Sequence, residues 1–407
     1  MSNFRKILTV LTLVLVVFVI WSAREDIMSA IGYLANTNLF FILLLIPEQL
    51  FMYYCAGQIF FSYMAAKGRA EISHRPGRKR KKKATAAEAI NVDLATSQKA
   101  AEKETVKAGE KSADGASAPK PKKFSSWLLA RISFELNFVN HAIPSGGFAG
   151  LGYITWRLRE FGSSAGQTSF MYALRYAITI LSNQFQTIVA IIILIATGGI
   201  VEGAWWVVGL TSLICVGIVV GLAAVVIIAS SRERINWFAR LATKFINGFV
   251  NIVTFGRKRQ VMKNGQIEDY LGDVYKDLTV ARKNKKILIH PIIWGVIYSF
   301  LEIATYWLVG ISMGHVEILP QIMIAEAIAS VIGAVMLTPG GVGGYEGTMI
   351  FLMSVLGVDA GLATAVVITT RVIVLIGTIV SGYGFYQNAV SKIGKKEREQ
   401  IMREVGE

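Results

Sequence analysis

The sequence of 407 residues has few cysteines, histidines and charged side chains. Its two cysteines, Cys55 and Cys215, are too few for a disulfide framework or a Cys-x-x-Cys metal site. Its four histidines form neither a His-Glu-x-x-His motif nor a cluster with cysteine, so we expect no metal and no cofactor. Charged residues make up 17% of the chain, against about 25% in soluble domains. This deficit excludes a soluble globular enzyme.

Hydrophobic residues make up 53% of the chain, and the mean hydropathy is +0.50. They are gathered in long blocks, and we expect six blocks to cross a hydrocarbon core of about 30 Å: 7–21, 39–65, 169–197, 204–230, 287–310 and 360–389. The first block also has the length of a signal-peptide core. The residues after it lack a cleavage pattern, so we expect an anchored span. The pattern predicts a polytopic membrane protein.

Two further apolar blocks are interrupted by proline and glycine. The first runs over 127–142, breaks at 144–147 and resumes over 148–161; the second runs over 320–337, breaks at 339–344 and resumes over 345–357. Proline removes a helical hydrogen bond, and consecutive glycines favour turns. Each resumed piece is too short for a full crossing. Each block therefore either crosses once or enters the membrane and returns as a re-entrant hairpin.

Positive charge decides between these interpretations. Residues 67–123 hold 16 Lys and Arg against 7 Asp and Glu, and residues 231–286 hold 13 against 5. Basic segments stay on the cytoplasmic side. If both broken blocks return, both basic segments and both termini lie inside, and Arg24 is the one Lys or Arg residue in the outer loops. We therefore predict an all-α integral membrane protein with six transmembrane helices, two oppositely oriented re-entrant helical hairpins and cytoplasmic N- and C-termini.

This topology divides the chain into six parts. They are the first two spans (1–66), a basic, disordered cytoplasmic linker (67–123), the first hairpin with two spans (124–230), cytoplasmic or interfacial amphipathic helices (231–286), a span with the second hairpin and the last span (287–389), and a cytoplasmic tail (390–407). The basic run at 75–83 either attracts anionic lipid or serves as a topology signal. No folded domain surrounds this run, so we expect no nucleic-acid partner.

The order of spans and hairpins predicts an inverted repeat. The two spans around the first hairpin match, in opposite orientation, the two around the second. Charged positions correspond roughly: Arg131 with Glu326, Arg175 with Arg371, and Glu48 with Glu302. Inverted repeats with broken helices that meet at mid-membrane are typical of transporters.

The helices that resume after each break are candidate anion sites. Their first N–H groups and the positive end of the helix dipole attract phosphate. The residues of the two breaks that we select as substrate-binding candidates are Pro144, Gly146, Gly147, Pro339, Gly340, Gly341, Gly343 and Gly344. Their glycines either let a lipid headgroup approach the backbone or only permit the turn and tight packing.

Charged residues inside apolar blocks are the other candidates, because burying charge in a membrane is costly. Arg371 either binds a lipid phosphate or forms a structural ion pair with Glu346, and both arrangements can alternate. Arg131 either faces the substrate or neutralises Glu135 one helical turn away. Glu302 is a candidate for carrying a proton or contacting a cationic headgroup. We identify no catalytic residue.

The two breaks and the last span resemble the flippase-like membrane domain of lysylphosphatidylglycerol synthases. The segments that carry the resemblance are 137–162, 338–347 and 369–380. Its most specific parts are the Pro-Gly-Gly-x-Gly-x-x-Glu run from Pro339 to Glu346, and Arg371. The first break matches the family's Asn-Pro-Gly pattern more loosely, through Asn140, Pro144 and Gly146. The insertion at 67–123 departs from the pattern.

The resemblance implies movement of an aminoacylated phospholipid to the outer leaflet. In full-length synthases, a separate soluble C-terminal domain makes that lipid. Here 18 residues follow the last span, so we expect no synthesis. We predict translocation of an anionic or aminoacylated phospholipid, or of a lipid-linked sugar, between the leaflets of a prokaryotic plasma membrane. With no ATP-binding motif, movement is passive or coupled to a gradient.

The expected partners are these lipids and a lipid-modifying enzyme or glycosyltransferase. Two alternatives stay open. One is a membrane-embedded enzyme or accessory subunit in lipid or glycolipid modification. The other is an ion or small-solute carrier.

Overall fold

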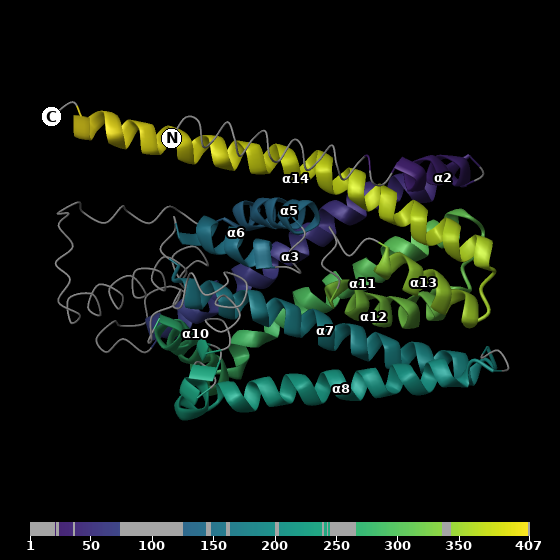
Figure 1. Cartoon of the computed structure of the whole chain (residues 1–407), viewed down its shortest axis with the longest axis horizontal. Coiled ribbons are helices and arrows are strands. Elements are labelled where there is room, and N and C mark those ends of the chain that lie inside the picture. Colours follow the sequence, from purple (N-terminus) through teal and green to yellow (C-terminus); the bar gives the residue numbers. More distant parts are fainter. Residues whose placement is uncertain are drawn as a thin grey trace.

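The structure is a computed structural model. It describes residues 21, 24–35, 37–73, 125–143, 148–159, 163–199, 203–237, 240–241, 243–244, 266–335 and 343–405. Within these ranges every regular element is helical (Figure 1). The elements are α2 (Arg24–Leu34), α3 (Leu39–Ser73), α5 (Ser126–Ala142), α6 (Phe148–Arg159), α7 (Ala165–Ala196), α8 (Trp205–Ala229), α10 (Gln266–Lys283), η1 (Lys285–Leu288), α11 (Ile289–Ser312), α12 (Leu319–Val335), α13 (Gly344–Val355) and α14 (Ala360–Val405).

Five helices are long and apolar enough to cross a membrane. These candidate spans are Leu39–Gly68, Ala165–Ala196, Trp205–Ala229, Lys285–Ser312 and Ala360–Lys392. They coincide with five of the six expected spans. Nearly all of the remaining one, 7–21, lies outside the described residues. The described part of the chain is thus all-helical, and its spans are those of a multi-pass membrane protein.

The broken blocks form two helix pairs, α5 with α6 and α12 with α13, and the members of each pair pack against each other. The helices have 17, 12, 17 and 12 residues. About 20 residues are needed to cross a bilayer, so the two 12-residue helices are too short to span one alone, and the two 17-residue helices are at the lower limit. The breaks at 144–147 and 336–342 lie outside the described residues, and the re-entrant path stays a prediction.

Serine side chains cap the start of two helices. Ser125 Oγ accepts a hydrogen bond from the N–H of Leu128 at 3.1 Å, and α5 begins at the next residue. Ser164 Oγ does the same for Gln167 at 3.1 Å, at the start of α7. Such caps satisfy backbone donors that have no partner within the helix.

The helix contacts exchange between the two halves of the chain. α5 packs against α14, and α12 packs against α7; α3 and α11 pack against each other. The contacts of α3 with α5 and of α6 with α7 have counterparts in those of α11 with α12 and of α13 with α14. If α3, α5, α6 and α7 are replaced in that order by α11, α12, α13 and α14, and the reverse, the same pairs of helices remain in contact. This pattern indicates that the two halves correspond, and their opposite orientation in the membrane stays a prediction.

Glycines let α5 approach two neighbouring helices closely. A Cβ atom on Gly57 of α3 would lie 2.7 Å from the backbone nitrogen of Ala130. A Cβ atom on Gly382 of α14 would lie 2.5 Å from the Cβ of Phe138. Small residues at helix interfaces allow such approach inside a membrane. The two contacts hold α5 between α3 and α14.

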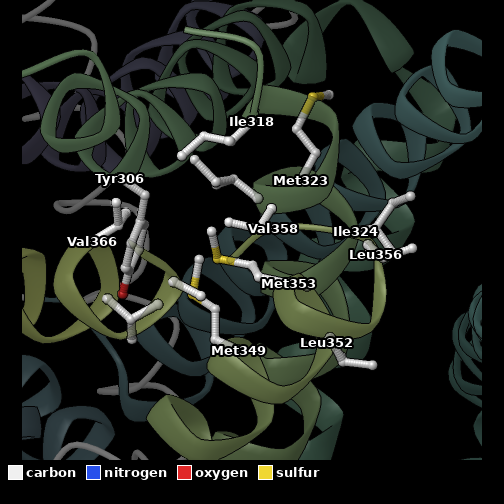
Figure 2. Packing of buried hydrophobic residues seen from close by; sticks show 14 of the residues in the cluster. Tyr306, Ile318, Met323, Ile324, Met349, Leu352, Met353, Leu356, Val358 and Val366 are labelled. Atoms are coloured by element: carbon white, nitrogen blue, oxygen red, sulfur yellow. The ribbon is translucent and has the colours of Figure 1, made fainter. Parts of the chain in front are cut away.

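The largest apolar cluster surrounds the second helix pair. Figure 2 shows Met323 of α12 and Met349 and Met353 of α13 among branched aliphatic side chains, with Tyr306 of α11 at the edge. A second cluster joins α3, α5, α6 and α7 to α10. α8, by contrast, contacts α7 and α12 and leaves most of its apolar surface exposed, as expected for a helix facing lipid.

Candidate functional site

Arg371 and Glu346 form an ion pair where α13 begins. Arg371 Nε donates to Glu346 Oε1 at 2.5 Å, and the two side chains are 20% and 10% exposed. Glu346 Oε2 also accepts from the N–H of Gly343 at 2.7 Å. Gly343 has a φ of 92°, which favours glycine. The Glu346 carboxylate thus accepts hydrogen bonds from both the Arg371 guanidinium and the backbone N–H of Gly343. This N–H stands at the start of a helix, where an anion would bind.

Aromatic rings enclose this ion pair. The guanidinium of Arg371 lies 4.7 Å from the ring centroid of Tyr345. That ring stacks on Tyr306 of α11, with centroids 6.4 Å apart. A guanidinium over an aromatic face gains electrostatic stabilisation, most where water is excluded. Arg371 is therefore fixed in orientation by α11, α13 and α14 together.

The end of the first helix pair reaches this pair of charges. His141, in the last turn of α5, interacts electrostatically with both Arg371 and Glu346. Next to it, Asn140 packs against the first turn of α6, where a Cβ atom on Gly150 would lie 2.0 Å from Asn140 Oδ1. That buried oxygen has no hydrogen-bond partner among the described residues. Polar groups from both broken blocks therefore meet in one region.

Arg131 belongs to a different cluster. It donates through Nε to Glu135 at 3.1 Å and through a terminal nitrogen to the Phe385 carbonyl of α14 at 3.2 Å. Glu135 is fully buried and also accepts from Arg157 Nε and from Tyr153 Oη of α6, both at 2.8 Å. The structure thus pairs Arg131 with Glu135, one of the two arrangements that the sequence allowed. This cluster ties α5 to α6 and α14.

Glu302 lies in a third group, at the contact of α3, α7 and α11. Tyr298 Oη donates to Glu302 Oε1 at 3.1 Å, and the Tyr298 ring centroid is 5.2 Å from the Arg175 guanidinium. Glu302 also interacts electrostatically with Glu48. Glu48 in turn accepts from Thr305 Oγ1 at 3.3 Å. Glu48 and Glu302, which the predicted repeat would make equivalent, are therefore neighbours.

Several candidates lie outside the described residues, namely Pro144, Gly146, Gly147, Pro339, Gly340 and Gly341. Gly343 and Gly344 are described and form the start of α13. Arg157 and Tyr153 were not among the candidates selected from the sequence. A charge and a phenol within a short apolar block could have indicated them. Among the described residues, no three His, Cys, Asp or Glu side chains are grouped so that they could hold a metal ion.

The family comparison covers both helix pairs and most of the spans. A family model described as Lysylphosphatidylglycerol synthase TM region matches residues 117–382. The matched range contains Asn140, Glu346 and Arg371. No curated protein and no solved structure matches the sequence.

Proposed function

The chain belongs to the lysylphosphatidylglycerol synthase TM-region family, and on this premise we propose that it translocates an anionic or aminoacylated phospholipid, or a lipid-linked sugar, between leaflets. The family relates the chain to lipid modification or translocation. A prokaryotic plasma membrane is its proposed location. A lipid-modifying enzyme or glycosyltransferase is the proposed protein partner.

The Arg371–Glu346 pair is the observation that carries this proposal. Guanidinium groups bind phosphate through paired, charge-assisted hydrogen bonds. A headgroup phosphate would replace the Glu346 carboxylate beside Arg371 and the Gly343 N–H, because it offers the same acceptor chemistry. Pairing with Glu346 keeps Arg371 neutralised between substrates. The acyl chains would remain in the bilayer while the headgroup passes.

The proposed path runs between two re-entrant hairpins, formed by α5 with α6 and α12 with α13. The short lengths of these helices and the exchanged contacts of the two halves support it. Irregular backbone at membrane depth is tolerated where it lines a wet cavity or is buried in protein. In this arrangement six spans surround the hairpins, and both termini are cytoplasmic.

Leaflet accessibility in proteoliposomes tests the proposal. Labelled phosphatidylglycerol, its lysyl form and a polyprenyl-phosphate sugar are each compared with wild-type protein and Arg371→Ala. A hydrogen bond to a charged group contributes about 1.5–3 kcal/mol, so we expect movement of the substrate to slow roughly ten- to hundredfold. Arg24→Ala is the control, because Arg24 is an exposed residue of α2.

A double variant separates binding from folding. Arg371→Ala leaves the buried Glu346 without its cation, which alone destabilises the protein. Arg371→Ala with Glu346→Ala removes both charges. We expect this double variant to recover stability but not lipid movement. Recovery of movement, or full movement in Arg371→Ala, would remove Arg371 from substrate binding; no acceleration of any lipid by folded wild-type protein would reject the function.

A further inference from the structure

Glu326 differs from the other buried carboxylates because no cation neutralises it among the described residues. It lies in the middle of α12 and is 5% exposed. Glu326 accepts a hydrogen bond from a neutral amide, Asn183 Nδ2 of α7, at 3.3 Å. Glu135 and Glu346, by contrast, each contact an arginine, at distances of 2.8 and 2.5 Å. An ionised carboxylate is costly to bury alone, so a neutral, protonated Glu326 fits this environment.

A second carboxylate lies near Glu326. Glu302 of α11 interacts electrostatically with Glu326, and two neighbouring carboxylates repel when both are ionised. Four elements pack against α12, namely α7, α8, α11 and α13. Their buried or partly buried titratable and charged groups include Arg175 of α7, Cys215 of α8, Tyr298, Glu302 and Tyr306 of α11, and Tyr345 and Glu346 of α13. Arg175, the one cation among them, is engaged with the Tyr298 ring and Glu302.

A row of hydrogen bonds connects Glu326 to an unsatisfied buried acceptor. Gln186 Nε2 donates to Ser299 Oγ at 2.7 Å, Ser299 Oγ donates to Asn183 Oδ1, and Asn183 donates to Glu326. Gln186 is 2% exposed, and its Oε1 has no hydrogen-bond partner among the described residues. Buried acceptors of this kind are normally satisfied by water. The row orients the Asn183 amide towards Glu326, and a water molecule at its far end would bring solvent into the same polar region.

The helix that carries Glu326 also adjoins the proposed headgroup site. A Cβ atom on Gly333 of α12 would lie 3.2 Å from the side chain of Tyr345, whose ring centroid is 4.7 Å from the Arg371 guanidinium. A negative headgroup at Arg371 would repel an ionised Glu326. A proton on Glu326 and an anionic headgroup at Arg371 therefore favour each other's binding, and this coupling is reciprocal.

We infer that Glu326 carries a proton that travels in the same direction as the anionic lipid and couples translocation to a proton gradient. The inference rests on the proposed function. On loading, the carboxylate gains an O–H bond; on release, that bond breaks and the proton leaves to water on the other side. No oxidation or reduction is involved.

The transport test uses the full chain in proteoliposomes that contain labelled phosphatidylglycerol and have different pH values inside and outside. We expect wild-type protein to accumulate the label in the leaflet on the less acidic side. Glu326→Gln preserves shape but cannot release a proton, so we expect loss of this accumulation. Glu317→Gln, with a side chain 63% exposed beside His315, is the matched control and should keep it. Accumulation unchanged in Glu326→Gln, or accumulation that follows sodium rather than pH, overturns the inference.

A spectroscopic test separates this inference from the proposed function. Infrared difference spectra of wild type against Glu326→Gln at neutral pH should show the carbonyl band of a protonated carboxyl group in wild type and its loss in the variant. Absence of that band overturns the inference even if lipid moves. Wild-type protein that shows the band but moves no lipid rejects the function and, with it, the coupling.

A second variant guards against misfolding of Glu326→Gln. Ser299→Ala breaks the hydrogen-bond row but leaves the carboxyl group in place. We expect it to keep the infrared band and to slow the pH-driven accumulation. An unchanged rate of accumulation would show that the row does not position Glu326 for proton exchange and would contradict that part of the inference.

Discussion

At the scale of single residues, Glu135 is the charge on which the first helix pair most depends. It is fully buried and pairs with Arg131 and Arg157. Glu135→Gln leaves two guanidinium groups without their anion, and breaking a buried ion pair costs about 3–5 kcal/mol. We expect a clearly lower unfolding temperature, measured in detergent by fluorescence and by retention on size exclusion.

An exposed ion pair supplies the control for this variant. Glu25 contacts Arg24 at 3.2 Å, but its side chain is 85% exposed. Exposed pairs contribute little to stability. Glu25→Gln should therefore leave the unfolding temperature nearly unchanged. An equal fall for both variants would show that burial of Glu135 does not set its importance.

Residue pairs close in sequence could be predicted, and distant ones could not. Helical spacing alone suggested that Arg131 faces Glu135, and the structure shows that contact at 3.1 Å. Arg157 and Tyr153 join the same carboxylate from the other side of the break. Their contact depends on how α6 folds back onto α5, and no local periodicity encodes that path.

At the scale of helices, close packing of α14 on α5 should be sensitive to one methyl group. Gly382→Ala would place its Cβ 2.5 Å from Phe138 Cβ and 2.8 Å from the carbonyl of Phe134. Overpacking of this kind costs about 1–3 kcal/mol, so we expect reduced thermal stability. The measurement is the unfolding temperature of the purified variant in detergent.

The same helix offers a matched control. Gly377 lies in α14 five residues earlier, and a Cβ atom there would meet nothing within 4 Å. Because alanine favours helix over glycine by about 1 kcal/mol, Gly377→Ala should be neutral or slightly stabilising. A loss at Gly377 as large as that at Gly382 would mean that helix contact is not the cause.

Hydropathy predicted where helices cross the membrane but not where they end. Five apolar blocks became candidate spans with nearly the expected bounds. α3 continues to Ser73 and α14 to Val405, well past their apolar runs. Lysine, glutamate and arginine favour helix as strongly as many apolar residues do. A helix can therefore extend into the polar segment that marks the end of a span.

At the scale of the whole molecule, contacts between the two halves of the chain decide which charged residues lie close together. Each broken helix of one half, α5 or α12, packs against the last helix of the other half, α14 or α7. The end of α5 consequently lies on the side of α14 that carries Arg371, and Asn183 of α7 contacts Glu326 of α12. The sequence indicated the repeat through its order of segments. It gave no sign of this exchange, because long-range packing between the halves decides it.

The orientation of the helix pairs can be tested across the whole molecule with single cysteines. Cys55 and Cys215 are both buried, so a background in which both are serine is the starting point. Exposed positions at the two ends of each pair are then replaced in turn: Trp127→Cys and Arg159→Cys for the first, Val316→Cys and Ala360→Cys for the second. A membrane-impermeant maleimide added to intact cells labels only outward-facing thiols.

Two returning hairpins and a single crossing give different labelling patterns. If both hairpins return, the thiols at 127 and 159 react only after permeabilisation, and those at 316 and 360 react in intact cells. A helix pair that crosses once would place its two thiols on opposite sides, because each end would then meet a different aqueous phase. The basic segments predict the first pattern, since a crossing would put strongly positive chain outside. Opposite labelling within either pair would contradict the re-entrant path. The proposed headgroup route between two hairpins would then also fail, because it requires both helix pairs to return.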